Sequence, residues 1–467
     1  MTGAAARARP LASTSDLPPP GGSVHLMGIG GAGMRGLAVL LHHAGYHVSG
    51  CDRGAADALR DLTSLGIRVE PAHDAAHLAG TDLLVRSSAV PTDLPEVARA
   101  ASAGVPVMRR ARALGAALDG RTLVGIAGTH GKTTITAMAG FAAAAAGLDP
   151  LVLVGGRVSD WDGFGRLGEG PAVVEADEFD RSFLELRPTV AVVSSLEAEH
   201  LDTYGDFASL RSAFAEFAAR ARHAGGLIYC HDDAGARALG ESTGFGVGYG
   251  FGPGAWCRIA ATGPRTCRLG WPGGVADITL RVPGRHNQLN AAAAFLSTLK
   301  LGADPARAAS GLARFRGVAR RLERIGDWPD LKVFDDYAHH PTEVAASIAA
   351  LREAHPAARL TVVFQPHLYT RTRDFAAAFA DALSAADAAR VLPVYPARET
   401  PIPGVTSELI TRAAAAEAID RDAALELVPP QGHEHDREEV LVFMGAGDVT
   451  ELAHAAIRRR TDDAVGA

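Results

Sequence analysis

Short apolar runs alternate with amphipathic or alanine-rich segments along most of the chain, a pattern typical of α/β folds. Three apolar runs, at residues 23, 121 and 331, each lead through a glycine-rich or acidic turn into a helical pattern: "SVHLMGIGGAGMRGLAVLLHH", "RTLVGIAGTHGKTT" and "LKVFDDYAHHPTEVAASIAALREAH". The pattern predicts an α/β protein with a flexible tail at 1–22 and three domains, at 23–118, 119–324 and 325–467.

Polar residues follow several of the predicted strands. In "AVVEADE" and "TVAVVSSLEAEH" an apolar strand runs into acidic residues, and further strands are expected in "LTVVFQPH", "RVLPVYPA" and "EVLVFMGAG". Open α/β sheets bind ligands beyond the carboxyl ends of their strands. We therefore expect these polar clusters to form a binding site rather than to be unrelated polar residues on the surface.

Composition narrows the class of protein. The chain is 47% hydrophobic and 21% charged with a net charge of −7, which gives no reason to expect nucleic acid or membrane partners. No apolar run reaches the roughly 18 residues of a membrane span, and "AMAGFAAAAAG" is interpreted as a buried helix. The N-terminus lacks the apolar core of a signal peptide. The cysteines have no C-x-x-C spacing, so a structural zinc site or disulfide framework is not expected and a reducing cytoplasm fits: Cys51, Cys230, Cys257 and Cys267.

The turn in "VGIAGTHGKTTITAM" has the chemistry of a phosphate-binding loop. It is shorter than the common G-x-x-x-x-G-K-[ST] pattern, because Ile126 stands where that pattern has its first glycine. Backbone N–H groups of a glycine turn converge on an anion, and the helix dipole adds to the attraction. Lys132 would contact the outer phosphates and the Thr133 hydroxyl would bind Mg²⁺, a better explanation of the turn than an ordinary helix cap.

Acidic groups and a histidine lie at the ends of the next two strands. Glu175 stands where a nucleotide-bound Mg²⁺ needs an oxygen ligand, although a solvated acidic turn has the same pattern. His200 taken alone is more typical of a structural histidine. Both gain weight if the fold places them in one crevice with the turn.

The first glycine run fits G-x-G-x-x-G after a strand, and Asp52 lies about where a ribose-binding acid belongs. The motif indicates a pyrophosphate on a helix N-terminus. A dinucleotide cofactor and a uridine diphosphate sugar both satisfy it, so the motif does not distinguish them. Its glycines are Gly28, Gly30, Gly31 and Gly33.

Later polar segments have both a functional and an ordinary interpretation. Asn287 and Asn290 share a helix face and could reach a base edge, although a capping role is more common for such residues. "DDYAHHPTE" places two acids and two histidines before a helix, more polar groups than a simple cap needs. The histidines of "HEH" at 433–435 are interpreted as solvated, and the pair at 42–43 as helix surface.

Taken together, the motifs resemble those of the Mur ligase family of peptidoglycan synthesis, and the resemblance covers about residues 23–455. The motifs are, in order, "GIGGAGM", "SSAVP", "AGTHGKTT", "EADE", "EHLDTYGD", "PGRHNQLNA", "RRLE", "DDYAHHPTE", "FQPHLYTRT", "VYPARETPIPGV" and "MGAGD". His130 together with "DDYAHHPTE" is specific to the branch that adds the first amino acid and to its recycling relative.

The resemblance implies a Rossmann-like N-terminal domain, a central ATP-binding domain of the P-loop type and a Rossmann-like C-terminal domain. It further implies a cytoplasmic ligase that uses ATP and Mg²⁺ to join L-alanine to the carboxylate of UDP-N-acetylmuramate through an acyl phosphate, for cell wall biogenesis, cell shape and cell division.

The resemblance also assigns residues. ATP is implied to bind Gly128, Thr129, His130, Gly131, Lys132, Thr133 and Thr134, with Asn287 and Asn290 at the adenine and Arg321 and Asp336 completing the site. Mg²⁺ is implied at Thr133, Glu175 and His200. The first glycine run, Asp52, Ser87 and Ser88 would bind the UDP-sugar, and His339, His367 and Arg371 the amino acid and acyl phosphate.

Four residues depart from the family pattern. Arg35 replaces a small residue, Phe179 a common serine, Ser195 the usual asparagine and Glu199 the usual aspartate. None of these removes a proposed catalytic group. Three alternatives remain: the recycling ligase that adds a tripeptide, an NAD-dependent oxidoreductase, and a non-catalytic UDP-sugar-binding protein.

Overall fold

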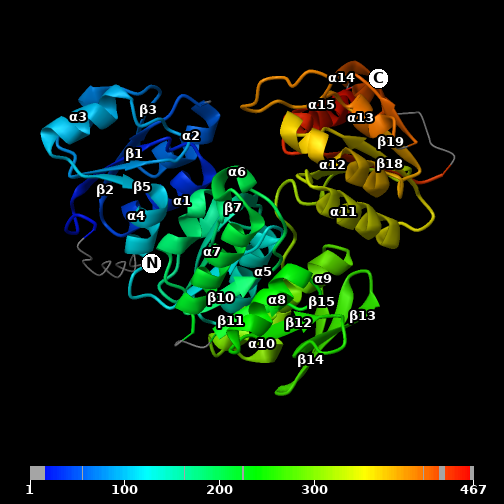
Figure 1. Cartoon of the computed structure of the whole chain (residues 1–467), viewed down its shortest axis with the longest axis horizontal. Helices are drawn as coiled ribbons and strands as arrows, with labels where there is room; N and C mark the ends of the chain where they lie inside the picture. The colour runs from blue at the N-terminus through cyan, green and yellow to red at the C-terminus, as the bar shows by residue number, and fades with distance from the viewer. Residues whose placement is uncertain are drawn as a thin grey trace, which may run out of the picture. The chain divides into compact units, whose positions relative to one another are not determined.

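The computed structural model of the protein describes residues 16–54, 56–161, 163–222, 226–413, 415–430 and 437–462. They fall into two compact units. Figure 1 shows the helices and strands of the whole chain with their labels. The first unit comprises the described parts of Met1–Ala260, Arg268–Ile278 and Leu289–Phe315. The second comprises Ala261–Cys267, Thr279–Gln288 and the described parts of Arg316–Ala467. Residues 1–15 of the expected tail and the "HEH" segment lie outside the described residues.

The first unit begins with a five-stranded parallel sheet of order β3-β2-β1-β4-β5. The central strand β1 is buried from Val24 to Met27, as expected for a parallel sheet that helices cover. The strands are β1 (Ser23–Met27), β2 (His47–Cys51), β3 (Arg68–Glu70), β4 (Leu83–Arg86) and β5 (Val107–Arg109). The helices are α1 (Ala32–His43), α2 (Ala56–Ser64), η1 (Ala75–Leu78), α3 (Pro95–Ala103) and α4 (Arg110–Ala117).

A ten-stranded sheet of order β15-β14-β13-β12-β11-β10-β6-β9-β7-β8 follows. β6 lies between β9 and β10 and is parallel to both, so the carboxyl ends of the three strands share one edge. The strands are β6 (Leu123–Ala127), β7 (Leu151–Val158), β8 (Gly163–Arg166), β9 (Ala172–Glu175), β10 (Val190–Val193), β11 (Gly226–Cys230), β12 (Val247–Gly250), β13 (Cys257–Gly263), β14 (Thr266–Trp271) and β15 (Gly274–Thr279).

The helices of this sheet include α5 (Lys132–Ala145), which confirms the expected buried, alanine-rich helix. α10 (Pro305–Leu312) packs closely on it, because a Cβ at Gly311 would lie only 2.5 Å from the Phe141 carbonyl oxygen. The other helices are η2 (Phe179–Glu185), α6 (Leu201–Tyr204), α7 (Phe207–Arg220), α8 (Ala234–Thr243) and α9 (Arg285–Lys300).

The second unit is built on a six-stranded sheet of order β16-β17-β21-β18-β19-β20, parallel except for β16. Along β21 (Glu439–Met444), Val440 and Val442 belong to one apolar core and Leu441 and Phe443 to another. Helices therefore cover both faces. The remaining strands are β16 (Glu323–Asp327), β17 (Leu331–Asp336), β18 (Arg359–Phe364), β19 (Ala388–Val391) and β20 (Ala416–Ala418). The helices are α11 (Pro341–Ala354), α12 (Tyr369–Leu383), α13 (Glu408–Thr411), α14 (Arg421–Glu426) and α15 (Val449–Asp462).

These three sheets confirm the predicted α/β class. The expected boundary at 118/119 falls between α4 and β6, and the one at 324/325 falls within β16. Across the described residues, none of the helices combines the length and the apolar character that a bilayer crossing requires.

Candidate active site

The turn after β6, here called the nucleotide turn (residues 128–134), is shaped by two glycines. Gly128 has φ +135° and Gly131 has φ +82°, a backbone region that side chains other than glycine rarely adopt. Added Cβ atoms would also collide, at 2.2 Å from Ser194 Oγ and at 2.6 Å from Asn290 Oδ1. Gly131 caps α5 without a side-chain hydrogen bond, so the first turn of the helix keeps the N–H groups of an anion site.

The segment after β10 holds the nucleotide turn in place. The Thr129 N–H donates to the Ser195 carbonyl oxygen (3.1 Å), and the His130 N–H donates to Ser195 Oγ (2.9 Å). Ser194 Oγ donates to the His130 carbonyl oxygen. In return the Glu197 N–H donates to Thr129 Oγ1 (3.0 Å), and the Glu197 carboxylate lies 3.1 Å from His130 Nε2. Ser195, a departure from the family pattern, therefore supports the turn.

Lys132 reaches back over the nucleotide turn. Its Nζ donates to the Gly128 carbonyl oxygen (2.7 Å) and to both carboxylate oxygens of Glu178 (2.8 and 2.9 Å). Burial alone would lower the pKa of Lys132, but the charges of Glu178, Asp177 and Glu175 and the hydrogen bonds that Lys132 donates to Glu178 outweigh burial and raise this pKa above its ordinary value. The lysine is therefore a permanent cation at the mouth of the turn.

The expected magnesium ligands lie on elements next to the nucleotide turn. Thr133 is in the first turn of α5, and Glu175 ends β9, the neighbour of β6. Gly155 leaves room for Glu175, since a Cβ there would lie 2.2 Å from its Oε2. His200 has φ +54°, and its ring packs edge-on against Phe179 with centroids 5.5 Å apart. Strained backbone of this kind is often retained at functional sites.

The two asparagines of α9 have different surroundings. Asn290 lies against the nucleotide turn at Gly131. Asn287 donates from Nδ2 to the Pro283 carbonyl oxygen (2.8 Å), a local side-chain-to-backbone hydrogen bond at the start of the helix. The adenine contact expected for this pair stays a prediction.

The turn after β1, here called the first turn (residues 28–33), is organised by Asp52. One carboxylate oxygen accepts from the Gly30 N–H (2.8 Å) and the other from the Gly54 N–H (2.7 Å). Gly28 has φ +79°, and a Cβ there would lie 3.1 Å from Ser87 Cβ. Asp52 and Ser87 therefore both lie beside the first turn, and the contacts to the UDP-sugar expected for them stay a prediction.

Further groups of this domain border the first turn. A Cβ at Gly33 would lie 3.0 Å from a terminal nitrogen of Arg110. Burial lowers the pKa of Arg35, while the charges of Asp61 and Asp52 act in the opposite direction. Arg35 itself belongs to the opening turn of α1, the helix into which the first turn leads. Ser88 is exposed on the loop after β4.

In the second unit, the predicted residues gather beyond the carboxyl end of β17. The Tyr337 ring lies between two arginines, 4.6 Å from the Arg320 guanidinium carbon and 5.0 Å from that of Arg321. Asp336 is 3% exposed and accepts a hydrogen bond from the Ser347 hydroxyl. Burial raises the pKa of Asp336 to about 6.

Two histidines extend this group. His339 Nδ1 lies 3.0 Å from the Tyr337 carbonyl oxygen, and its ring meets that of His367 at a centroid distance of 6.1 Å. His367 stacks on Tyr395 (5.8 Å). Burial, then the charges of His339 and Arg371, lower the pKa of His367 to about 4, so its imidazole is neutral at pH 7.

The structure therefore brings the predicted residues together in three groups. The first-turn residues share one sheet edge, the nucleotide-turn residues share another, and Arg321, Asp336, His339, His367 and Arg371 belong to the second unit. Sequence reasoning missed the contacts of Glu178 and of the 194–197 segment. The one available signal was "EADE", where an acid recurs three residues after Glu175.

Comparison with known proteins agrees with this division of the site. Three domain models match: "Mur ligase family, catalytic domain" over 23–122, "Mur ligase middle domain" over 126–298 and "Mur ligase, glutamate ligase domain" over 320–447. Each of the three groups of site residues lies within one of these matched segments.

Whole-chain relatives extend the match. A UDP-N-acetylmuramate–L-alanine ligase of Kineococcus radiotolerans is 46% identical over 448 residues, 92% of this chain and 94% of that protein. A UDP-N-acetylmuramate–L-alanine ligase of Paenarthrobacter aurescens is 44% identical over 436 residues, which cover 92% of this chain and 95% of that protein. The crystal structure of a UDP-N-acetylmuramate–alanine ligase from Thermotoga maritima has a TM-score of 0.78 at 27% identity, covering 94% of this chain and 99% of that one. This chain belongs to the Mur ligase family.

Proposed function

We propose that this enzyme joins L-alanine to the carboxylate of UDP-N-acetylmuramate at the expense of ATP, in the cytoplasm, as a step of peptidoglycan precursor synthesis. One observation carries the proposal. A chain similar over more than nine tenths of its length to curated L-alanine ligases keeps a permanent lysine cation in its nucleotide turn. That cation is what transfer of a phosphoryl group requires.

ATP is assigned to the nucleotide turn. The glycine backbone and the α5 N-terminus attract phosphate, and Lys132 adds a full positive charge at the same point. The ion pair with Glu178 keeps the Lys132 amine protonated and holds it in position. The ammonium would therefore lie close to the phosphate oxygens of a nucleotide bound at the turn. Asn290 lies beside the turn and is our candidate contact to the nucleoside.

Magnesium fits the neighbouring strand ends. A hydroxyl, a carboxylate and an imidazole are available at Thr133, Glu175 and His200, and Gly155 clears the space that the carboxylate needs. When bound, the ion would neutralise charge on the transferring phosphoryl group. Phe179 packs on the His200 ring and is assigned the role of orienting it.

The UDP-sugar is assigned to the first turn. Its pyrophosphate would lie on the N–H groups at the start of α1, and Asp52 fixes the turn by holding the Gly30 N–H. Nearby Arg35 supplies a cation that a pyrophosphate can use. If the first turn bound NAD in an oxidoreductase, the nucleotide turn with its lysine and the neighbouring acidic strand end would have no role.

The chemistry needs two displacements. The muramoyl carboxylate oxygen attacks the γ-phosphorus of ATP, the bond to the β-phosphate oxygen breaks, and ADP and an acyl phosphate result. The amine of L-alanine then attacks the acyl carbon, the carbon–oxygen bond to phosphate breaks, and the amine loses a proton. Lys132 stabilises charge in the first step. His339, His367 and Arg371 are assigned to the amino acid and acyl phosphate, and the neutral His367 does not repel an ammonium group.

The test is phosphate release from ATP by the purified chain with UDP-N-acetylmuramate. Three reactions are compared: L-alanine, a tripeptide acceptor, and no acceptor, with omission of the UDP-sugar as the control. We expect sustained release only with L-alanine and the UDP-sugar together, with one amide product per phosphate. Release with the tripeptide alone would assign the recycling activity instead. No release in any reaction would overturn the proposal.

A further inference from the structure

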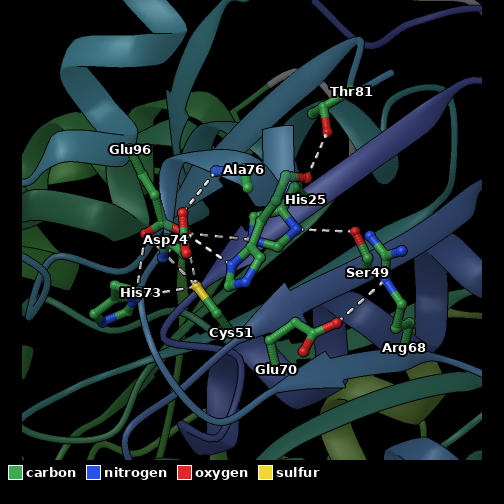
Figure 2. A network of polar contacts seen from close by, with 11 residues as sticks. His25, Ser49, Cys51, Arg68, Glu70, His73, Asp74, Ala76, Thr81 and Glu96 are labelled. Atoms are coloured by element: carbon green, nitrogen blue, oxygen red, sulfur yellow. Dashed lines mark hydrogen bonds and ion pairs between the residues drawn. The ribbon is translucent and has the colours of Figure 1, made fainter. Parts of the chain in front are cut away.

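A buried polar cluster lies in the first domain, apart from the groups described above (Figure 2). It consists of His25 in β1, Cys51 at the end of β2, His77 in η1 and Glu96 in α3, and we call it the His/Cys/Glu cluster. Its members come from four elements that are well separated in the sequence. Spacing rules for zinc motifs therefore could not find it, because no two of its members are close along the chain.

The donor atoms of the cluster converge. One donor atom from each of the four residues lies within 4.8 Å of each of the others. Glu96 Oε1 is 3.5 Å from Cys51 Sγ, 3.1 Å from His77 Nδ1 and 4.0 Å from His25 Nε2. Tetrahedral zinc with bonds of about 2.0–2.3 Å separates its ligands by about 3.3–3.8 Å. The three distances from Glu96 Oε1, 3.1 to 4.0 Å, span this range, and the remaining pairs of donor atoms lie within 4.8 Å.

His25 provides a second, independent observation. It is 0% exposed, and its Nε2 has no hydrogen-bond partner among the described residues although it faces Glu96. The other ring nitrogen, Nδ1, lies 2.9 Å from Ser49 Oγ. In the tautomer in which Nδ1 donates to the Ser49 hydroxyl, the Nε2 lone pair is left for a metal. A buried ring nitrogen without a partner is costly unless something binds it.

We propose that the His/Cys/Glu cluster is a structural site for a divalent transition metal of the zinc class. Two imidazoles, a thiolate and a carboxylate are a donor set that suits Zn²⁺ and disfavours Mg²⁺, which binds mainly oxygen ligands and does not favour a thiolate. All four positions are closed by protein side chains, and three of the four residues are fully buried. A structural zinc site is closed in this way, whereas a catalytic one keeps a position open.

A second layer of groups supports the ligands. His73 Nδ1 lies 3.0 Å from Cys51 Sγ and 3.3 Å from Glu96 Oε2, and the Asp74 N–H donates to Glu96 Oε1 (3.0 Å). Figure 2 shows these groups around the carboxylate. Groups of this kind orient metal ligands and are here positioning residues.

The site would stabilise the first turn. The Cys51 carbonyl oxygen accepts from the N–H groups of Gly28 (2.8 Å) and Ile29 (3.2 Å), and the next residue, Asp52, holds the Gly30 N–H. A metal bound to Cys51 would thus tie β1, β2, η1 and α3 together directly beneath the turn. The inference stands on the cluster alone and does not depend on the proposed ligase activity.

The test is cobalt titration of the full chain after treatment with a chelator. Cobalt bound to a thiolate gives a ligand-to-metal absorption band in the near ultraviolet, and the magnesium site assigned above offers no cysteine, so the band reports this cluster. We expect saturation at about one equivalent, displacement of the band by Zn²⁺, and a rise in melting temperature with Zn²⁺.

Variants separate the cluster from other thiols. Cys51→Ala and His77→Ala should each lose the band, whereas Cys230→Ala, which removes another buried free thiol, and His200→Ala should keep it. A wild-type chain that gives no thiolate band at saturating cobalt would overturn the proposal, whatever the variants do. A band that survives in Cys51→Ala would also overturn it, because the metal would then lie elsewhere.

Discussion

The first turn and the nucleotide turn share one backbone design but differ in their charges. Each follows a buried parallel strand, contains a glycine with positive φ and leads into a helix N-terminus. In the first turn a carboxylate, Asp52, takes the Gly30 N–H. In the nucleotide turn a lysine cation lies over the Gly128 carbonyl oxygen. In our proposal the backbone offers an anion site in both turns, and the side chains distinguish the turn assigned to the pyrophosphate from the turn assigned to phosphoryl transfer.

The largest expected effect comes from removing the cation of the nucleotide turn. Lys132→Ala should reduce ligation on the order of 1,000-fold, because stabilisation of the transferring phosphoryl group is lost. It should also destabilise the protein, since removing one partner of a buried ion pair costs about 3–5 kcal/mol. Steady-state kinetics and thermal unfolding measure the two effects.

A double variant separates catalysis from stability. In Lys132→Ala/Glu178→Gln the buried carboxylate no longer carries an unpaired charge, so the melting temperature should recover while ligation stays low. Glu178→Gln alone is the control. If the double variant regained activity with stability, the lysine would be a structural residue only.

A smaller effect should follow from changing the backbone of the nucleotide turn. Gly131 (φ +82°) begins α5 and Gly147 (φ +80°) follows its end, so alanine at either adds similar strain of about 1–2 kcal/mol. Only at Gly131 does the new Cβ meet a neighbour, Asn290 Oδ1 at 2.6 Å. Gly131→Ala should raise the KM for ATP about tenfold, equivalent to about 1.4 kcal/mol. Gly147→Ala should lose stability without this kinetic change, and equal KM values in the two variants would contradict the assignment.

The last prediction is that dissolved CO₂ has no effect on the ligation rate. A lysine carbamylated by dissolved CO₂ would offer a further oxygen ligand for magnesium. No lysine lies between Lys132 and Lys300, and Lys332 is paired with Asp327 (2.9 Å), so no lysine close to His200 in sequence can supply that ligand. Ligation rates in degassed buffer should therefore not change when bicarbonate is added. A clear recovery with bicarbonate would place a modified lysine in the metal site.

Local patterns predicted much of the fold. Hydrophobic periodicity and glycine positions predicted the strand-turn-helix units that begin at β1, β6 and β17 and the buried helix α5. These signals can be recognised because each depends only on residues that are close in sequence. The strands β13 to β15 were not predicted, because "CRIAATG" and "GVADIT" have mixed exposure rather than a continuous apolar run.

The site contacts were harder to predict because they join distant segments. Lys132 and Glu178 are 46 residues apart, and the support of His130 by Ser195 spans 65. The sequence flagged Ser195 only as a departure, and the structure shows its hydroxyl holding the turn. The His/Cys/Glu cluster was missed for the same reason, since its members meet only after β1 and β2 pair.

The most direct test of the account is a crossed binding measurement on the two turns. Gly30→Val, which would place a Cβ 2.9 Å from the Asp52 carboxylate, and Lys132→Ala are each titrated calorimetrically with UDP-N-acetylmuramate and with ATP. We predict that Gly30→Val loses the UDP-sugar and keeps ATP, and that Lys132→Ala does the reverse. Thermal unfolding checks that both variants are folded. A folded variant that loses both ligands equally would contradict the assignment of one nucleotide to each turn.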